Sequence, residues 1–155
     1  MSFRIHALAV TPFTALFDMS DSELANFKAT RMVADAKPGF PCRVSLADAE
    51  VGEALILVNF EHQAGDSPYQ SSHAIFVREQ AEQAFPTVGE VPEALKIRLT
   101  SIRAFDSKHF MVAADVVDGA LLAEAIPAML ANPEVDYLHL HNAKQGCVAA
   151  RVTRA

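Results

Sequence analysis

The chain has 155 residues, of which 51% are hydrophobic and 21% are charged, and its formal net charge is −6. This size and balance predict a single globular domain over residues 1–155. The 13 Lys and Arg residues form no basic cluster, which argues against a nucleic-acid partner. No apolar run approaches the ~20 residues of a membrane-spanning helix. We therefore expect no membrane partner and a cytoplasmic location.

The N-terminal part of the chain predicts short strands around one capped helix. Residues 3–8 alternate weakly between apolar and polar side chains, which indicates an opening strand. Ser20 and Glu23 have the spacing of a capping box, so we expect a helix from Asp21 to about Phe27. A second strand is expected at residues 29–34.

The middle of the chain contains its most apolar segment. Residues 53–62 are apolar on both faces, which is typical of a strand in the centre of a covered sheet. Residues 63–72 then form a long polar loop, and loops of this length often carry function. A further strand is expected at residues 74–77 and a helical turn at residues 79–84.

The C-terminal part predicts two hairpins separated by a helix. Residues 95–117 read as a hairpin that turns at 106–108. Residues 121–130 have a helical period, with Pro127 either kinking or dividing the helix. Residues 137–153 predict a closing hairpin. Because most strands are joined by turns, we expect an α+β fold with a mainly antiparallel, twisted sheet and two or three helices.

Several short motifs occur in a fixed order along the chain. They are Pro41-Cys42-Arg43, Gly52-Glu53 before Leu55-Ile56-Leu57, Pro68-Tyr69 before Ala74-Ile75-Phe76-Val77-Arg78, Leu95 through Asp106, and His141-Asn142-Ala143 before Gly146-Cys147. Together they resemble the family catalogued as domain of unknown function 1203, over about residues 39–154. The resemblance implies a small, soluble, mostly bacterial domain. It brings no activity, cofactor or catalytic residue.

Polar side chains in these motifs predict a cleft. Arginine, imidazole and amide groups all donate hydrogen bonds to anions. We therefore favour a small-molecule or protein-binding module, with an anionic metabolite as the candidate ligand. Arg98 and Arg103 lie five residues apart on one expected strand, so one of the two would point into the cleft. The candidate ligand-binding residues are Arg43, Tyr69, His73, Arg103, His141, Asn142 and Cys147.

A thiol-dependent enzyme is the alternative function. Cys42 would be the nucleophile, and His73, His139 or His141 would be its base. The candidate catalytic residues are accordingly Cys42, His73 and His141. The competing interpretation is that Cys42 and Cys147 are small buried side chains that pack like apolar residues.

Two further hypotheses concern the segment from Tyr137 to His141. His139 and His141 are two apart on a strand, so they share a face and could share a metal ion. The favoured interpretation is instead an outward-facing pair that alternates with core leucines. The sequence identifies no third or fourth ligand that would complete a metal site with these two histidines, so we expect no metal and no cofactor. Exposed edge strands here would also allow a homodimer.

Overall fold

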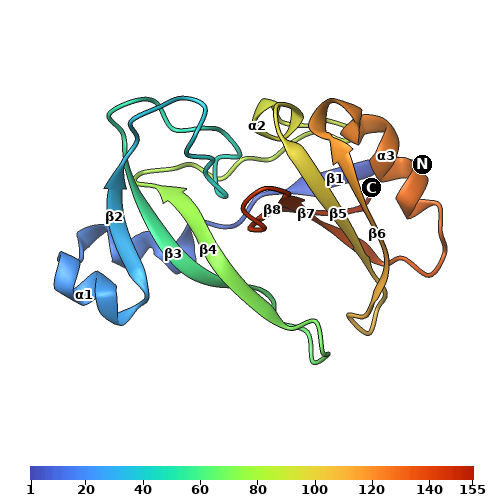
Figure 1. Ribbon diagram of the computed structural model, residues 1–155, viewed down its shortest axis with the longest axis horizontal. Coiled ribbons are helices and arrows are strands. Elements are labelled where there is room, and N and C mark those ends of the chain that lie inside the picture. The colour runs from blue at the N-terminus through green and yellow to red at the C-terminus, as the bar shows by residue number, and fades with distance from the viewer.

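The computed structural model describes residues 1–155 and contains two antiparallel sheets (Figure 1). The five-stranded sheet has the order β1-β8-β7-β5-β6, and the three-stranded sheet has the order β2-β3-β4. The strands are β1 (Phe3–His6), β2 (Ala29–Val33), β3 (Ala54–Gln63), β4 (Ser71–Arg78), β5 (Leu99–Phe105), β6 (Met111–Asp118), β7 (Tyr137–Asn142) and β8 (Val148–Arg154). The helices are α1 (Asp21–Asn26), α2 (Glu93–Lys96), α3 (Leu122–Leu130) and the 3-10 helices η1 (Thr11–Asp18) and η2 (Gly119–Leu121). The predicted α+β class is confirmed.

The predicted cap of the first helix is present. The backbone N–H of Glu23 donates to Ser20 Oγ at 3.3 Å, and Ser20 Oγ donates to Glu23 Oε1 at 2.9 Å. Both bonds occur at the N-terminus of α1, where backbone N–H groups lack partners within the helix. The helix begins at Asp21 as predicted and ends at Asn26.

The Ser20→Ala variant is expected to unfold with about 1 kcal/mol less free energy than the wild type, because the cap is lost. Urea denaturation measures this difference. Ser22→Ala is the matched control, since Ser22 Oγ contacts only Ser20 Oγ and caps no backbone group. Equal midpoints for Ser20→Ala and Ser22→Ala would contradict the prediction.

Strand β7 is the centre of the five-stranded sheet. It pairs with β8 on one side and β5 on the other, so it has no free edge. The homodimer hypothesis required an exposed edge strand near Tyr137–His141, but β7 is not at an edge. The edge strands of this sheet are β1 and β6. Leu138 and Leu140 are fully buried, and they belong to the same core cluster as Leu122, Ile126 and Leu130 of α3.

The opposite face of β7 carries the two histidines, and the prediction that they face outward is wrong. His139 is 4% exposed and His141 is 1% exposed. His62 of β3 covers them, with ring centroids 6.0 Å from His139 and 5.0 Å from His141. The sequence pattern could not reveal this, because the cover comes from the other sheet.

Two local predictions were also wrong. Residues 79–84 form no helix, and the Ala84 N–H donates to the carbonyl of Val44 instead. The hairpin strand expected from residue 95 starts only at Leu99, because Glu93–Lys96 form the one-turn helix α2, which is too short to show a period. Of the two alternatives for Pro127, division of the helix is excluded, because α3 continues through this residue. None of the helices is long and apolar enough to cross a bilayer.

Candidate functional site

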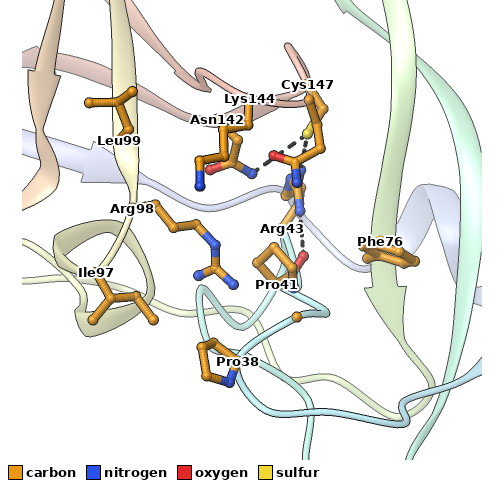
Figure 2. Close-up of a pocket in the computed structure, with 12 residues that line it drawn as sticks. Pro38, Pro41, Arg43, Phe76, Ile97, Arg98, Leu99, Asn142, Lys144 and Cys147 are labelled. Carbon is orange, nitrogen blue, oxygen red and sulfur yellow. Dashed lines mark hydrogen bonds between the residues drawn. The ribbon is translucent and has the colours of Figure 1, made fainter.

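A pocket of about 360 Å³ lies where the residue 38–43 loop meets the β7–β8 turn (Figure 2). Phe76 of β4 and the residues that begin β5 complete its walls. Both sheets therefore contribute to it. It is lined by Pro38, Gly39, Pro41, Arg43, Phe76, Ile97, Arg98, Leu99, Asn142, Lys144, Gln145 and Cys147.

Two buried residues that line the pocket, Arg43 and Cys147, form an arginine–thiol contact. Arg43 Nη2 donates to Cys147 Sγ at 2.9 Å, and Asn142 Nδ2 lies 3.6 Å from the same sulfur (Figure 2). The Arg43 Nε donates to the Val148 carbonyl at 2.6 Å, and Nη1 donates to the Pro41 carbonyl. Through these bonds, the single side chain of Arg43 joins its own loop to the start of β8.

A part-buried ion pair fixes Arg98, another residue that lines the pocket. Arg98 donates from Nη1 to Asp48 Oδ2 at 2.9 Å and from Nη2 to Asp48 Oδ1 at 2.5 Å. Burial raises the pKa of the Asp48 carboxyl, but the Arg98 bonds outweigh burial and hold that pKa below its ordinary value. The pair therefore fixes the residue 38–48 loop against the beginning of β5.

A cluster of histidines lies next to the pocket, beyond the β7–β8 turn. The Gly146 carbonyl of this turn accepts a hydrogen bond from His141 Nδ1 at 2.9 Å. A Cβ atom on Gly146 would lie 4.0 Å from His73 Nε2, so this ring also lies against the turn. The cluster consists of His62, His139 and His141, whose ring centroids are 5.0–6.1 Å apart.

A hydrogen bond fixes the tautomer of one member of the histidine cluster. Because His141 Nδ1 donates to a carbonyl, neutral His141 keeps a lone pair on Nε2. His62 Nε2 lies 3.1 Å from Ser71 Oγ. His141 Nε2, His62 Nδ1 and His139 Nδ1 are buried without a hydrogen-bond partner. The cluster thus contains three buried ring nitrogens whose hydrogen-bonding capacity is unsatisfied.

Burial and neighbouring positive charge keep these rings neutral. Burial, then the proximity of His141 and His62, lowers the pKa of His139 to about 3. Burial lowers the pKa of His141 to about 4, although its bond to the Gly146 carbonyl opposes the change. The pKa of His62 is also lowered, by burial first and then by Arg103. The cluster is therefore uncharged at neutral pH.

The surroundings of the histidine cluster do not suit a metal ion. Arg103 and Arg151 flank His139 on the neighbouring strands β5 and β8, and neither arginine forms an ion pair. No group of three His, Cys, Asp or Glu side chains in the chain is arranged to hold a metal ion. Two arginines without a nearby carboxylate oppose a divalent cation by charge repulsion.

The predicted ligand-binding residues divide between two places. Arg43, Asn142 and Cys147 line the pocket. His141 and Arg103 belong to the face that carries the histidine cluster, and His73 lies beside them. Tyr69 packs edge-on against Phe105 and Phe110 instead.

Other pocket and cluster residues were not singled out from the sequence. Lys144, Gln145 and Asp48 were not among the predicted site residues. His62 lies in the predicted apolar strand of residues 53–62. Its presence among aliphatic residues was the only feature of the sequence that could have pointed to a site there. Arg98 lines the pocket from just before β5, while Arg103 does not line it.

Cys42 lacks the histidine partner that the enzyme hypothesis requires. Its sulfur accepts bonds from the backbone N–H groups of Ser45 at 3.4 Å and Arg78 at 3.3 Å. No imidazole forms a hydrogen bond with it, and it packs in an apolar core with Val44, Ile56 and Val77. Both cysteines are free thiols. The thiol that faces the main pocket is Cys147.

Comparisons with known proteins agree with the family resemblance. A family model described as "Protein of unknown function (DUF1203)" matches residues 39–154, which is more than half of the chain. The match includes the whole pocket lining except Pro38. No curated protein and no solved structure shows detectable similarity to the chain.

Proposed function

Since the chain belongs to the DUF1203 family, whose description assigns no function, we propose from the pocket that it binds a small anionic molecule. The observation that carries this proposal is a buried arginine with no carboxylate partner. Arg43 is 2% exposed, and its acceptors are two carbonyls and a thiol. A buried cation is costly unless an anion offsets it, and an anionic ligand in the pocket would do so.

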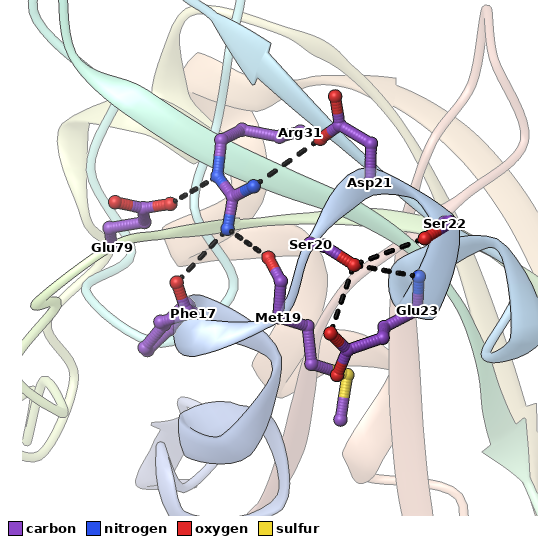
Figure 3. Close-up of polar contacts among 8 residues, drawn as sticks. All are labelled: Phe17, Met19, Ser20, Asp21, Ser22, Glu23, Arg31 and Glu79. Atoms are coloured by element: carbon purple, nitrogen blue, oxygen red, sulfur yellow. Dashed lines mark hydrogen bonds and ion pairs between the residues drawn. The ribbon is translucent and has the colours of Figure 1, made fainter.

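Arg31 shows how an arginine is satisfied elsewhere in the same chain (Figure 3). Its guanidinium donates to Glu79 at 2.9 Å and to Asp21 at 3.4 Å, and also to the carbonyls of Phe17 and Met19. Arg78 and Arg98 likewise pair with carboxylates. Among these arginines, Arg43 is the most buried and lacks such a partner.

The rest of the pocket is also suited to an anion. None of its lining residues is acidic, whereas Lys144 is basic and Asn142 and Gln145 carry amides. Arg98 is basic as well, but Asp48 already offsets its charge. Lys144 forms no ion pair and is exposed, so its ammonium group is free to meet a ligand. A volume of about 360 Å³ is at the lower end of the range typical of small-molecule sites, ~300–1,000 Å³.

Thermal unfolding with phosphate, citrate and glutamate, at matched ionic strength and with chloride as reference, tests this function. A ligand at about ten times its Kd is expected to add about 1.4 kcal/mol, or roughly 3–6 °C in Tm. Arg43→Met and Lys144→Gln are expected to reduce the shift. Lys108→Gln, in the β5–β6 turn, is the matched control for loss of one exposed lysine.

Two results would overturn the proposal. One is that none of the three anions shifts the Tm of the wild type. The other is that Lys144→Gln and Lys108→Gln retain the same ligand-induced Tm shift, because an anion in this pocket should interact with Lys144 and not with Lys108. Lys144 is exposed, so its replacement keeps the test informative even if Arg43→Met fails to fold.

A further inference from the structure

The pocket has an apolar part as well as its polar groups. Ile97 and Leu99 are large aliphatic side chains where α2 passes into β5, yet they are 49% and 46% exposed. Phe76 of β4 lines the pocket from another side, with its ring centroid 5.1 Å from that of Phe40. Five of the 12 lining residues have such apolar side chains, and these are Pro38, Pro41, Phe76, Ile97 and Leu99. A ligand that removes this surface from water gains free energy in proportion to the apolar area covered.

The side chain that is free to meet a charged group comes from a different element. Lys144 lies in the β7–β8 turn, is exposed and forms no ion pair. Arg98 is already paired with Asp48. Arg43 adds positive charge from within the wall, but its Nε, Nη1 and Nη2 atoms each donate a hydrogen bond already. One free ammonium group at the rim therefore suits a ligand with a single negative charge.

The charged and the apolar side chains lie on different sides of the pocket. Figure 2 shows Lys144 and Asn142 above the pocket, and Ile97 and Pro38 below it. A ligand with one charged end and one apolar end would satisfy both sides at once. Phosphate, citrate and glutamate would meet the polar side only, because none of them has a sizeable apolar end.

We propose that the pocket binds a small aromatic monocarboxylate, with the carboxylate at Lys144 and the ring on the apolar side chains. This inference rests on the proposed anion-binding function and names its ligand class. A ring suits the site better than a flexible alkyl chain, because it is rigid and loses little conformational freedom on binding. Its flat face also matches the ring of Phe76, and aromatic pairs gain more free energy than their buried area alone gives.

Benzoate, benzamide and acetate separate the two parts of this recognition. Benzamide keeps the ring without the charge, and acetate keeps the carboxylate without the ring. Each is titrated into the isotope-labelled wild-type protein at constant ionic strength, and the amide chemical shifts give both the Kd and the place of binding. We expect benzoate to bind at least about tenfold more tightly than acetate, because the ring covers apolar surface. It should also bind more tightly than benzamide, and the shifted amides should be those of the pocket.

Two pairs of variants assign these effects to side chains. Lys144→Gln should weaken the binding of benzoate but not that of benzamide, and its control Lys108→Gln should weaken neither. Leu99→Ser should weaken the binding of benzoate but not that of acetate. Its control is Leu121→Ser, because Leu121 is 51% exposed in η2 and does not line the pocket. All four side chains are exposed, so these variants should keep the fold.

Three results would overturn the inference. They are that benzoate binds no more tightly than acetate, that the shifted amides lie outside the pocket, or that Leu99→Ser and Leu121→Ser bind benzoate equally. If citrate still gives a Tm shift that depends on Lys144, any of these results overturns this inference alone. Equal Kd values for benzoate and benzamide would show that the charge is not recognised, and would overturn the proposed function as well.

Discussion

The protein is expected to lose stability as the pH falls below 6.5, because the histidine cluster is buried in its neutral form. The unfolded chain binds a proton on each histidine near pH 6.5, whereas folded His139 does so only at about 3 and folded His141 at about 4. Protons therefore favour the unfolded state throughout this window. The stability that the two neutral histidines contribute is fully present above pH 6.5 and is lost progressively below it.

The size of this loss of stability follows from the difference between the pKa values of each histidine in the unfolded and folded states. A tenfold difference in proton affinity corresponds to about 1.4 kcal/mol. At about pH 5, each of the two histidines is expected to remove about 2 kcal/mol from the free energy of unfolding. Asp48 and Glu53 also have lowered pKa values, but their ordinary values are 3.8 and 4.5. A change in the free energy of unfolding between pH 6.5 and about pH 5 is consequently due mainly to histidines.

Urea denaturation at about pH 7.5 and 5 measures this loss. His139→Phe removes one titrating ring but keeps the aromatic packing against Phe105 and Tyr137. It should therefore reduce the loss by about 2 kcal/mol. His6→Gln, a half-buried histidine outside the cluster, is the control and should retain most of the loss. Equal stability of the wild type at the two pH values would refute the prediction.

Asp48→Ala is expected to cost about 1–3 kcal/mol, because it leaves the part-buried guanidinium of Arg98 without its two-pronged carboxylate partner. The Asp48 side chain is 5% exposed, and that of Arg98 is 18% exposed. The same substitution removes the acceptor of the Gly39 N–H, whose residue also lines the pocket. We therefore expect the pocket wall to loosen, and any stabilisation by phosphate, citrate or glutamate to fall with it.

Glu50→Gln is the matched control for the loss of one carboxylate from the same loop. Glu50 pairs with Lys37, but both side chains are about half exposed or more, so the expected cost is about 0–1 kcal/mol. Denaturant midpoints at neutral pH compare the two variants. A cost for Asp48→Ala no larger than that for Glu50→Gln would show that the Arg98 pair does not hold the wall.

Local patterns predicted those elements whose signal lies within the element itself. The Ser20-x-x-Glu23 spacing identified the start of α1, because both capping groups are close in sequence. The continuous apolar run of residues 53–62 identified a central strand, and β3 is the middle strand of its sheet. The closing hairpin was also recognised, since β7 and β8 are joined by a short turn containing Gly146, which has a positive φ of 82°.

Elements that depend on distant partners were not predictable in this way. The alternation of leucine and histidine in β7 indicated one buried and one exposed face. Both faces are in fact buried, because β3 brings His62 onto the histidines. Likewise, residues 79–84 were expected to form a helical turn, but a bond to Val44 holds them in an irregular path.

The sequence by itself determined the α+β class, most strand positions, the family, and three residues that meet in the pocket, Arg43, Asn142 and Cys147. Their residue types and the strand periods are local properties of the chain. Only the tertiary structure decided which groups meet. It placed Arg43 104 residues from its sulfur partner, away from any carboxylate, and it assembled the histidine cluster from two sheets. Burial and pairing depend on contacts between distant segments, so no local pattern could specify them.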